Sequence, residues 1–140
     1  MSDIVLTASQ ASAVERCVNS TGNYFITGCG GTGKSTVLRE VIRRLQSRWG
    51  ADTGKVAITA STGAAACGVS GTTLHAFGGI RLGMDSVRVC IARARSDRKV
   101  RSRWASVEVL VIWLRKIIFD MIKCWIAMLL FFFGFGVFFI

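Results

Sequence analysis

Hydrophobic and polar positions in residues 1–112 follow two patterns, one typical of helices and one typical of buried strands. Apolar residues recur at helical spacing along one face of 8–19 and of 36–48. Short, mostly apolar runs at 23–27, 56–60 and 107–112 have the length and composition of strands. Because strands and helices alternate along the chain, the pattern predicts an α/β fold with a parallel sheet.

Local sequence signals indicate where some of these helices begin and which strands are buried. Thr7 and Gln10 have the spacing of a capping box, which predicts a helix that starts at Ala8. The run 107–112 is apolar nearly throughout, as expected of a central parallel strand buried on both faces. The run 23–27 is expected to be a short buried strand. Two further helices are expected to begin near residues 62 and 72, the second of them with a threonine at its N-terminus.

The end of the chain has a different character. Residues 124–140 carry no charge and include six phenylalanines. Seventeen residues lie at the short edge of the ~17–25 that a membrane-spanning helix uses. The chain therefore divides into a lobe at 1–112 and an apolar tail at 113–140. The tail is expected to be either a Phe-rich C-terminal helix that anchors the chain in a membrane or an out-of-frame segment.

Size and cysteine content limit the class of protein. At 140 residues the chain holds one domain at most. Its five cysteines form no C-x-x-C pair, and their odd number, without a signal peptide, favours reduced thiols inside a cell. The only histidine, His75, cannot build a metal site alone. The N-terminus is not Arg-rich or amphipathic and does not resemble a transit peptide.

Charge is concentrated in one segment. The formal net charge is +10, and residues 81–103 hold eight basic residues against Asp85 and Asp97. One interpretation is a polyanion partner such as nucleic acid. The other is a solvated helix face that keeps the protein soluble. The basic residues are Arg81, Arg88, Arg93, Arg95, Arg98, Lys99, Arg101 and Arg103.

The strongest chemical signal is the run 28–35, which fits the phosphate-binding pattern G-x-x-x-x-G-K-[ST]. Its glycines allow a tight turn and leave no side chain between the backbone amides and a phosphate chain. The following helix directs its positive end at the anion. Lys34 would reach the β- and γ-phosphates, and the Ser35 hydroxyl would ligate Mg²⁺. The predicted loop residues are Gly28, Cys29, Gly30, Gly31, Thr32, Gly33, Lys34, Ser35 and Thr36.

Several blocks together resemble the first ATPase lobe of the petite-integration-frequency (Pif-type) DNA helicases of helicase superfamily one. The resemblance extends from about Leu6 to Ile112. Among its blocks, Gly-Thr-Thr-Leu-His is unusually particular to these enzymes. The blocks are Leu6–Gln10, Gly28–Ser35, Thr59–Ala66, Gly71–Phe77 and Arg103–Trp104 before Val109–Ile112.

The resemblance implies a partial RecA-like P-loop lobe that uses ATP and Mg²⁺. It implies that Gln10 contacts the adenine base, beside its capping role. Members of the family couple ATP hydrolysis to 5′-to-3′ unwinding of single-stranded and forked DNA in replication, repair, recombination and telomere maintenance. They work in the nucleus or the mitochondrion. Three residues would lie along the single-stranded DNA track: Ser61, Thr62 and His75.

The chain departs from the family at one point. After Ile112 the family places an Asp-Glu pair that holds Mg²⁺ and aligns water, and here Trp113 and Leu114 stand there. The resemblance then implies a truncated or frameshifted fragment without a second lobe, which binds ATP but does not unwind DNA. Two alternatives remain open: a nucleotide- or DNA-binding regulatory module without turnover, and a membrane-anchored P-loop protein.

Overall fold

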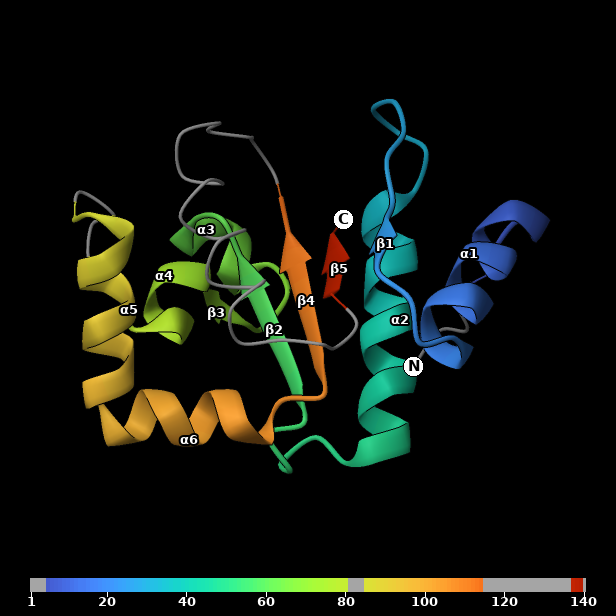
Figure 1. Ribbon diagram of the computed structural model, residues 1–140. Coiled ribbons are helices and arrows are strands. Elements are labelled where there is room, and N and C mark those ends of the chain that lie inside the picture. The colour runs from blue at the N-terminus through green and yellow to red at the C-terminus, as the bar shows by residue number, and fades with distance from the viewer. Residues whose placement is uncertain (1–4, 81–84, 115–136, 140) are drawn as a thin grey trace.

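The computed structural model describes residues 5–80, 85–114 and 137–139, and Figure 1 shows a parallel sheet with helices on both faces. The sheet has five strands in the order β1-β5-β4-β2-β3, and every neighbouring pair is parallel. The helices are α1 (Ala8–Asn19), α2 (Lys34–Trp49), α3 (Gly63–Cys67), α4 (Leu74–Gly78), α5 (Val87–Ser96) and α6 (Arg98–Ser106). The strands are β1 (Tyr24–Phe25), β2 (Val56–Ala60), β3 (Thr72–Thr73), β4 (Val109–Trp113) and β5 (Val137–Phe139).

Strand β4 lies in the middle of the sheet and separates two hydrophobic cores. Val109 and Val111 pack in the core formed with α1 and α2. Leu110 and Ile112 pack on the other face, in the core formed with α4, α5 and α6. Successive side chains of a strand point to opposite faces, so an entirely apolar strand can serve both cores. The prediction of a central strand buried on both faces is confirmed.

The core beneath α1 and α2 consists of side chains that are shielded from solvent. Leu38 and Val41 of α2 and Val14 of α1 have no exposed surface. Cys17 of α1 is also buried there, and that burial raises the pKa of its thiol to about 11. The capping box predicted at the start of α1 is present, with Thr7 as the N-cap residue.

The first strand differs from its prediction. Only Tyr24 and Phe25 form β1, and the side chain of Phe25 is 62% exposed. The expectation of a buried strand over 23–27 is therefore wrong. The physical reason is position: β1 is the outermost strand of the sheet, so fewer neighbours cover it than cover β4.

Only a short part of the apolar tail is described. Val137–Phe139 form β5, which pairs between β1 and β4, so these residues are a strand where a helix was expected. The rest of the proposed membrane-spanning segment, 124–136 and 140, lies outside the described residues. Within the described ranges, no helix combines the length and the apolar character that crossing a bilayer requires.

The basic segment forms two helices that meet at a sharp corner. Helices α5 and α6 meet at Asp97, which ends α5 and caps α6. Its carboxylate accepts hydrogen bonds from the backbone N–H groups of Lys99 and Val100 at 2.8 and 3.1 Å. In Figure 1 the two helices form an L, with α5 running alongside the sheet and α6 crossing below it.

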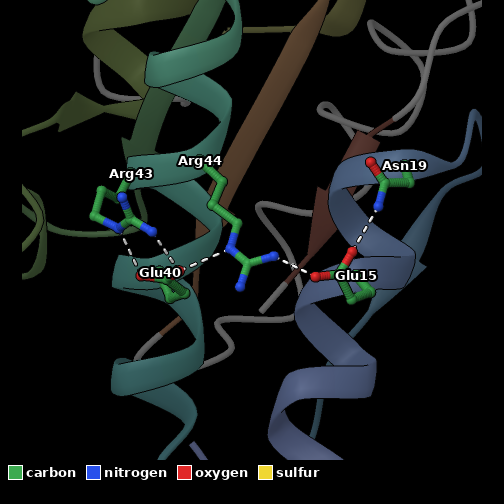
Figure 2. Close-up of polar contacts among 5 residues, drawn as sticks. All are labelled: Glu15, Asn19, Glu40, Arg43 and Arg44. Carbon is green, nitrogen blue, oxygen red and sulfur yellow. Dashed lines mark hydrogen bonds and ion pairs between the residues drawn. The ribbon is translucent and has the colours of Figure 1, made fainter. Parts of the chain in front are cut away.

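On the other face of the sheet, an ion-pair cluster joins helices α1 and α2 (Figure 2). Glu40 of α2 is buried and accepts hydrogen bonds from Arg43 and Arg44, each at 2.7 Å. Arg44 also pairs with Glu15 of α1, whose carboxylate accepts from Asn19 at 2.6 Å. The hydrogen bonds from Arg43 and Arg44 hold the pKa of the Glu40 carboxyl at about 2, against an ordinary value of 4.5.

We expect Glu40→Gln to destabilise the fold at neutral pH but not in acid. A folded-state pKa below the unfolded one adds stability above the unfolded pKa of 4.5, and that stability is lost as pH falls towards 2. Because Arg43 is largely solvated, the loss at about pH 7 should be only about 1–2 kcal/mol. Urea unfolding at about pH 7 and about pH 2.5 measures it. A gap between the two proteins that stays constant with pH would contradict this role.

Candidate nucleotide-binding site

The parallel sheet places the candidate residues along one edge. The glycine loop follows the end of β1, Ser61 follows β2, Leu74 follows β3, and Trp113 ends β4. Because all strands run in the same direction, these positions share the carboxyl edge of the sheet. In open α/β sheets, this is the edge at which ligands bind.

The glycine loop turns sharply into α2. Gly31 and Gly33 have φ values of 79° and 80°, a left-handed conformation that favours glycine. Gly33 is the N-cap residue of α2, and its carbonyl accepts from the N–H groups of Thr36 and Val37 at 2.9 and 3.0 Å. No side chain caps α2, so amides at its start remain available to an anion.

Lys34 reaches back over the loop. Its Nζ donates to the carbonyl oxygens of Gly28 and Cys29 at 2.6 and 2.7 Å. The Thr32 hydroxyl also donates to the Cys29 carbonyl, at 2.9 Å. The single ammonium group therefore lies within the curve of the loop, at the head of α2. A phosphate oxygen entering this curve would replace two neutral carbonyls with a charged partner.

Gln10 joins α1 to the glycine loop. Its Oε1 accepts from the backbone N–H of Thr7 at 2.9 Å, which completes the capping box. Its Nε2 donates to the carbonyl of Thr32 at 3.1 Å. A Cβ added to Gly33 would lie 2.4 Å from this Nε2, so the flexible Gln10 side chain would have to move, and the φ of 80° at Gly33 separately favours glycine. The sequence predicted the cap but not this contact.

The remaining predicted loop residues differ in their exposure to solvent. Ser35 is exposed in the first turn of α2, and Thr36 beside it is half-buried. Cys29 is exposed on the loop as a free thiol. The described residues contain no cluster of three or more His, Cys, Asp or Glu side chains that could hold a metal ion. The metal-binding role of Ser35 stays a prediction.

The three residues predicted for the DNA track lie after two adjacent strands. Ala60 and Thr73 are register partners at the ends of β2 and β3. The segments that follow them, which carry Ser61–Thr62 and His75, therefore start next to each other. The Thr62 hydroxyl caps α3 and accepts from Ala65 N–H at 3.2 Å. The Ser61 hydroxyl is buried and has no hydrogen-bond partner among the described residues. Partial burial lowers the pKa of His75, which favours the neutral ring.

Arg103 is a contributor that the sequence reasoning grouped with the general basic charge. Its Nη1 donates to the carbonyls of Ala76 and Phe77 at 2.9 and 3.0 Å, and its guanidinium lies 5.6 Å from the Phe77 ring centroid. Phe77 in turn packs edge-on against Trp104, with centroids 4.8 Å apart. These contacts fix α4, and with it His75, on α6. The sequence signal that could have revealed this role is the family block in which Arg103 precedes Trp104.

This fold and this loop define a P-loop nucleotide-binding lobe with a parallel sheet. Residues 5–124 match the family model described as PIF1-like helicase. The chain belongs to the PIF1-like helicase family. The match extends past Ile112, where the sequence blocks quoted above end.

Named relatives agree with this assignment. The chain is 40% identical over 104 residues to the ATP-dependent DNA helicase PIF1 of Emericella nidulans, covering 74% of this chain and 14% of that protein. It is 43% identical over 105 residues to the human ATP-dependent DNA helicase PIF1, covering 75% of this chain and 15% of that protein. The crystal structure of Pif1 helicase from Candida albicans superimposes with a TM-score of 0.70 and 36% identity, covering 79% of this chain and 24% of that one. The chain thus spans about one seventh of the length of these curated relatives.

Proposed function

We propose that this chain forms the nucleotide-binding lobe of a Pif-type, 5′-to-3′ ATP-dependent DNA helicase and binds ATP at residues 28–36. The observation that carries the proposal is the position of the Lys34 ammonium within the curve of the loop, at the uncapped head of α2. Backbone amides, a helix terminus and one lysine together form an anion site. The relatives named above are ATP-dependent DNA helicases, which supports the same substrate.

Mg²⁺ fits this site as the partner of the nucleotide. The exposed Ser35 hydroxyl at the first turn of α2 would be a ligand of the ion, beside the phosphate oxygens. When bound, Mg²⁺ would neutralise charge on the phosphates. Gln10, already fixed between Thr7 and the loop, would contact the adenine base.

Single-stranded DNA would cross the carboxyl edge of the sheet beside the nucleotide. Ser61, Thr62 and His75 would face it, since they follow neighbouring strands on that edge. Hydroxyl groups bind phosphate and sugar oxygens, and a neutral imidazole can stack on a base. The same proposal includes binding of forked DNA and a role in replication, repair, recombination or telomere maintenance. It also includes action in the nucleus or the mitochondrion.

Turnover by this chain is proposed to be very slow. Trp113 and Leu114 stand where an acidic pair would hold Mg²⁺ and orient water, and Trp113 packs against the cores instead. Phosphoryl transfer depends on positioning and charge neutralisation, both of which need such groups. DNA-stimulated ATP hydrolysis at ordinary helicase rates would refute this part. Binding without hydrolysis would also fit the alternative of a regulatory module. Adding this chain to an unwinding assay of a full-length helicase would test that alternative.

Alkylation of Cys29 offers a direct test of nucleotide binding. Cys29 and Cys67 are exposed, so iodoacetamide should modify both, whereas Cys17 and Cys90 are buried. Mg-ATP at ten times its Kd should slow the modification of Cys29 about tenfold, because only unliganded protein exposes the loop. Cys67 serves as the internal control and should react at an unchanged rate. Equal rates for Cys29 with and without Mg-ATP, by peptide mass mapping, would reject the site.

A further inference from the structure

The basic residues of α5 and α6 fall into two groups. Arg93 pairs with Asp85 at 2.6 Å, and Arg103 binds the carbonyls of α4, so both have structural roles. The others are exposed, and of these Arg88, Arg98, Lys99 and Arg101 form no ion pair with an acidic side chain among the described residues. The exposed group comprises Arg88, Arg95, Arg98, Lys99 and Arg101. We call this group the α5–α6 basic face.

These two helices carry little negative charge. Asp97 is the only acidic residue between 87 and 106, and its carboxylate already accepts two backbone hydrogen bonds at the start of α6. Clustered like charges repel one another and cost stability unless a partner neutralises them. The face is therefore suited to a polyanion.

The helices arrange these charges as a track. Arg88 and Arg95 lie seven residues apart on α5, which puts them on the same side, about 10 Å apart along the axis. Arg98 and Arg101 lie three residues apart on α6, so they are neighbours on one side of the helix, and both are exposed. Arg95 and Arg98 lie on either side of Asp97 in the sequence, where the two helices meet, so basic residues stand on both sides of the corner that the L forms in Figure 1.

This track is separate from the proposed nucleotide and DNA residues. Helix α6 leads into the amino end of β4, whereas the glycine loop follows the carboxyl end of β1. In a parallel sheet these ends are opposite edges, and β4 alone is about 15 Å long. Helix α5 connects the two levels, because it runs alongside the sheet from the level of α3 down to α6 (Figure 1).

We propose that the α5–α6 basic face is a second nucleic-acid site, which binds the phosphate backbone without regard to sequence. Guanidinium groups match phosphate oxygens in geometry as well as in charge, and four of the five side chains are arginines. The inference deepens the proposed function and rests on it only for the identity of the polyanion. A strand or duplex arm leaving the carboxyl edge would follow α5 to the corner and continue along α6.

The test compares two double variants that remove the same charge. Arg98→Gln with Arg101→Gln alters the basic face, and Arg16→Gln with Arg39→Gln alters exposed positions on α1 and α2. Binding of a fluorescent single-stranded oligonucleotide and of a duplex of the same sequence is measured at about 50 and 200 mM salt. The face variant should bind about tenfold more weakly at the lower salt, and its salt slope should fall by about 1.4–1.8. The control should change less than twofold. The arm with the larger loss identifies the single strand or the duplex as the natural ligand.

Three results would overturn the proposal: equal losses in both variants, no loss in either, or binding of polyglutamate as tight as that of DNA. The same variants are titrated with Mg-ATP, and both should keep the affinity of the unaltered protein. Failure of the unaltered protein to bind Mg-ATP would refute the proposed nucleotide site and leave the oligonucleotide comparison intact.

Discussion

Lys34→Ala is expected to weaken Mg-ATP binding by about 100-fold, equivalent to about 2.7 kcal/mol. The Lys34 ammonium is the one cationic group that the described contacts place on the loop, 2.6 Å from the Gly28 carbonyl and 2.7 Å from that of Cys29. A triphosphate entering the loop exchanges these neutral acceptors for charged oxygens. Alanine removes that gain and leaves only backbone amides and the helix terminus. Titration with a fluorescent ATP analogue in the presence of Mg²⁺ measures the loss.

Lys55→Ala is the matched control. It removes an equal charge from a residue that pairs with Glu108 at the amino end of β2, on the opposite edge of the sheet. Its effect on nucleotide affinity should stay below twofold. If Lys34→Ala also stays within twofold, or if both variants lose affinity equally, the nucleotide is bound elsewhere or by net charge alone.

The central part of the fold was predictable because its sequence signals are strong and local. Strand β2 has the predicted bounds, and the apolar run before Trp113 forms a strand buried on both faces. Helices α1 and α2 also follow their apolar stripes, with α2 beginning two residues earlier than predicted. In each case one periodic pattern coincides with one element, and tertiary packing does not override it.

The misses have different physical causes. The strand at Phe25 was expected to be buried because the middle of 23–27 is hydrophobic, but the order of strands, which these residues do not encode, puts it at the edge. The division of the basic segment at Asp97 had a usable signal, an acidic N-cap residue before a new helix. Strand β5 pairs across more than a hundred residues with β1, and no local pattern encodes such a partner.

The candidate site was predictable in its residues but not in its contacts. The motif predicted that Lys34 and the glycines lie on one tight loop, because that arrangement depends on local spacing. It did not reveal that Gln10 bonds the carbonyl of Thr32, since that contact needs α1 packed beside α2. Glu15 and Arg44 hold those helices together through an ion pair between residues 29 positions apart, which the sequence does not mark.

Gly71→Ala is expected to destabilise the protein by about 2–3 kcal/mol, through overpacking instead of backbone strain. A Cβ at this position would lie 2.5 Å from the carbonyl oxygen of Ile58 and 2.9 Å from its Cγ2. The carbonyl belongs to β2, so the main chain of β2 or β3 would have to move. That movement would disturb the pairing of Thr72 with Thr59 and the position of the helix that carries His75. The glycine that opens the Gly-Thr-Thr-Leu-His block is therefore required for close approach of two strands.

Gly63→Ala, at the first position of α3, is the comparison. Nothing lies within 4 Å of a Cβ added there, and alanine favours a helix more than glycine does, so stability should be unchanged or slightly higher. Urea unfolding followed by tryptophan fluorescence gives both free energies. If Gly71→Ala unfolds within about 0.5 kcal/mol of the unaltered protein, the two strands do not approach as closely as the Ile58 contact requires, and the DNA-facing segment after β3 is not fixed by this glycine.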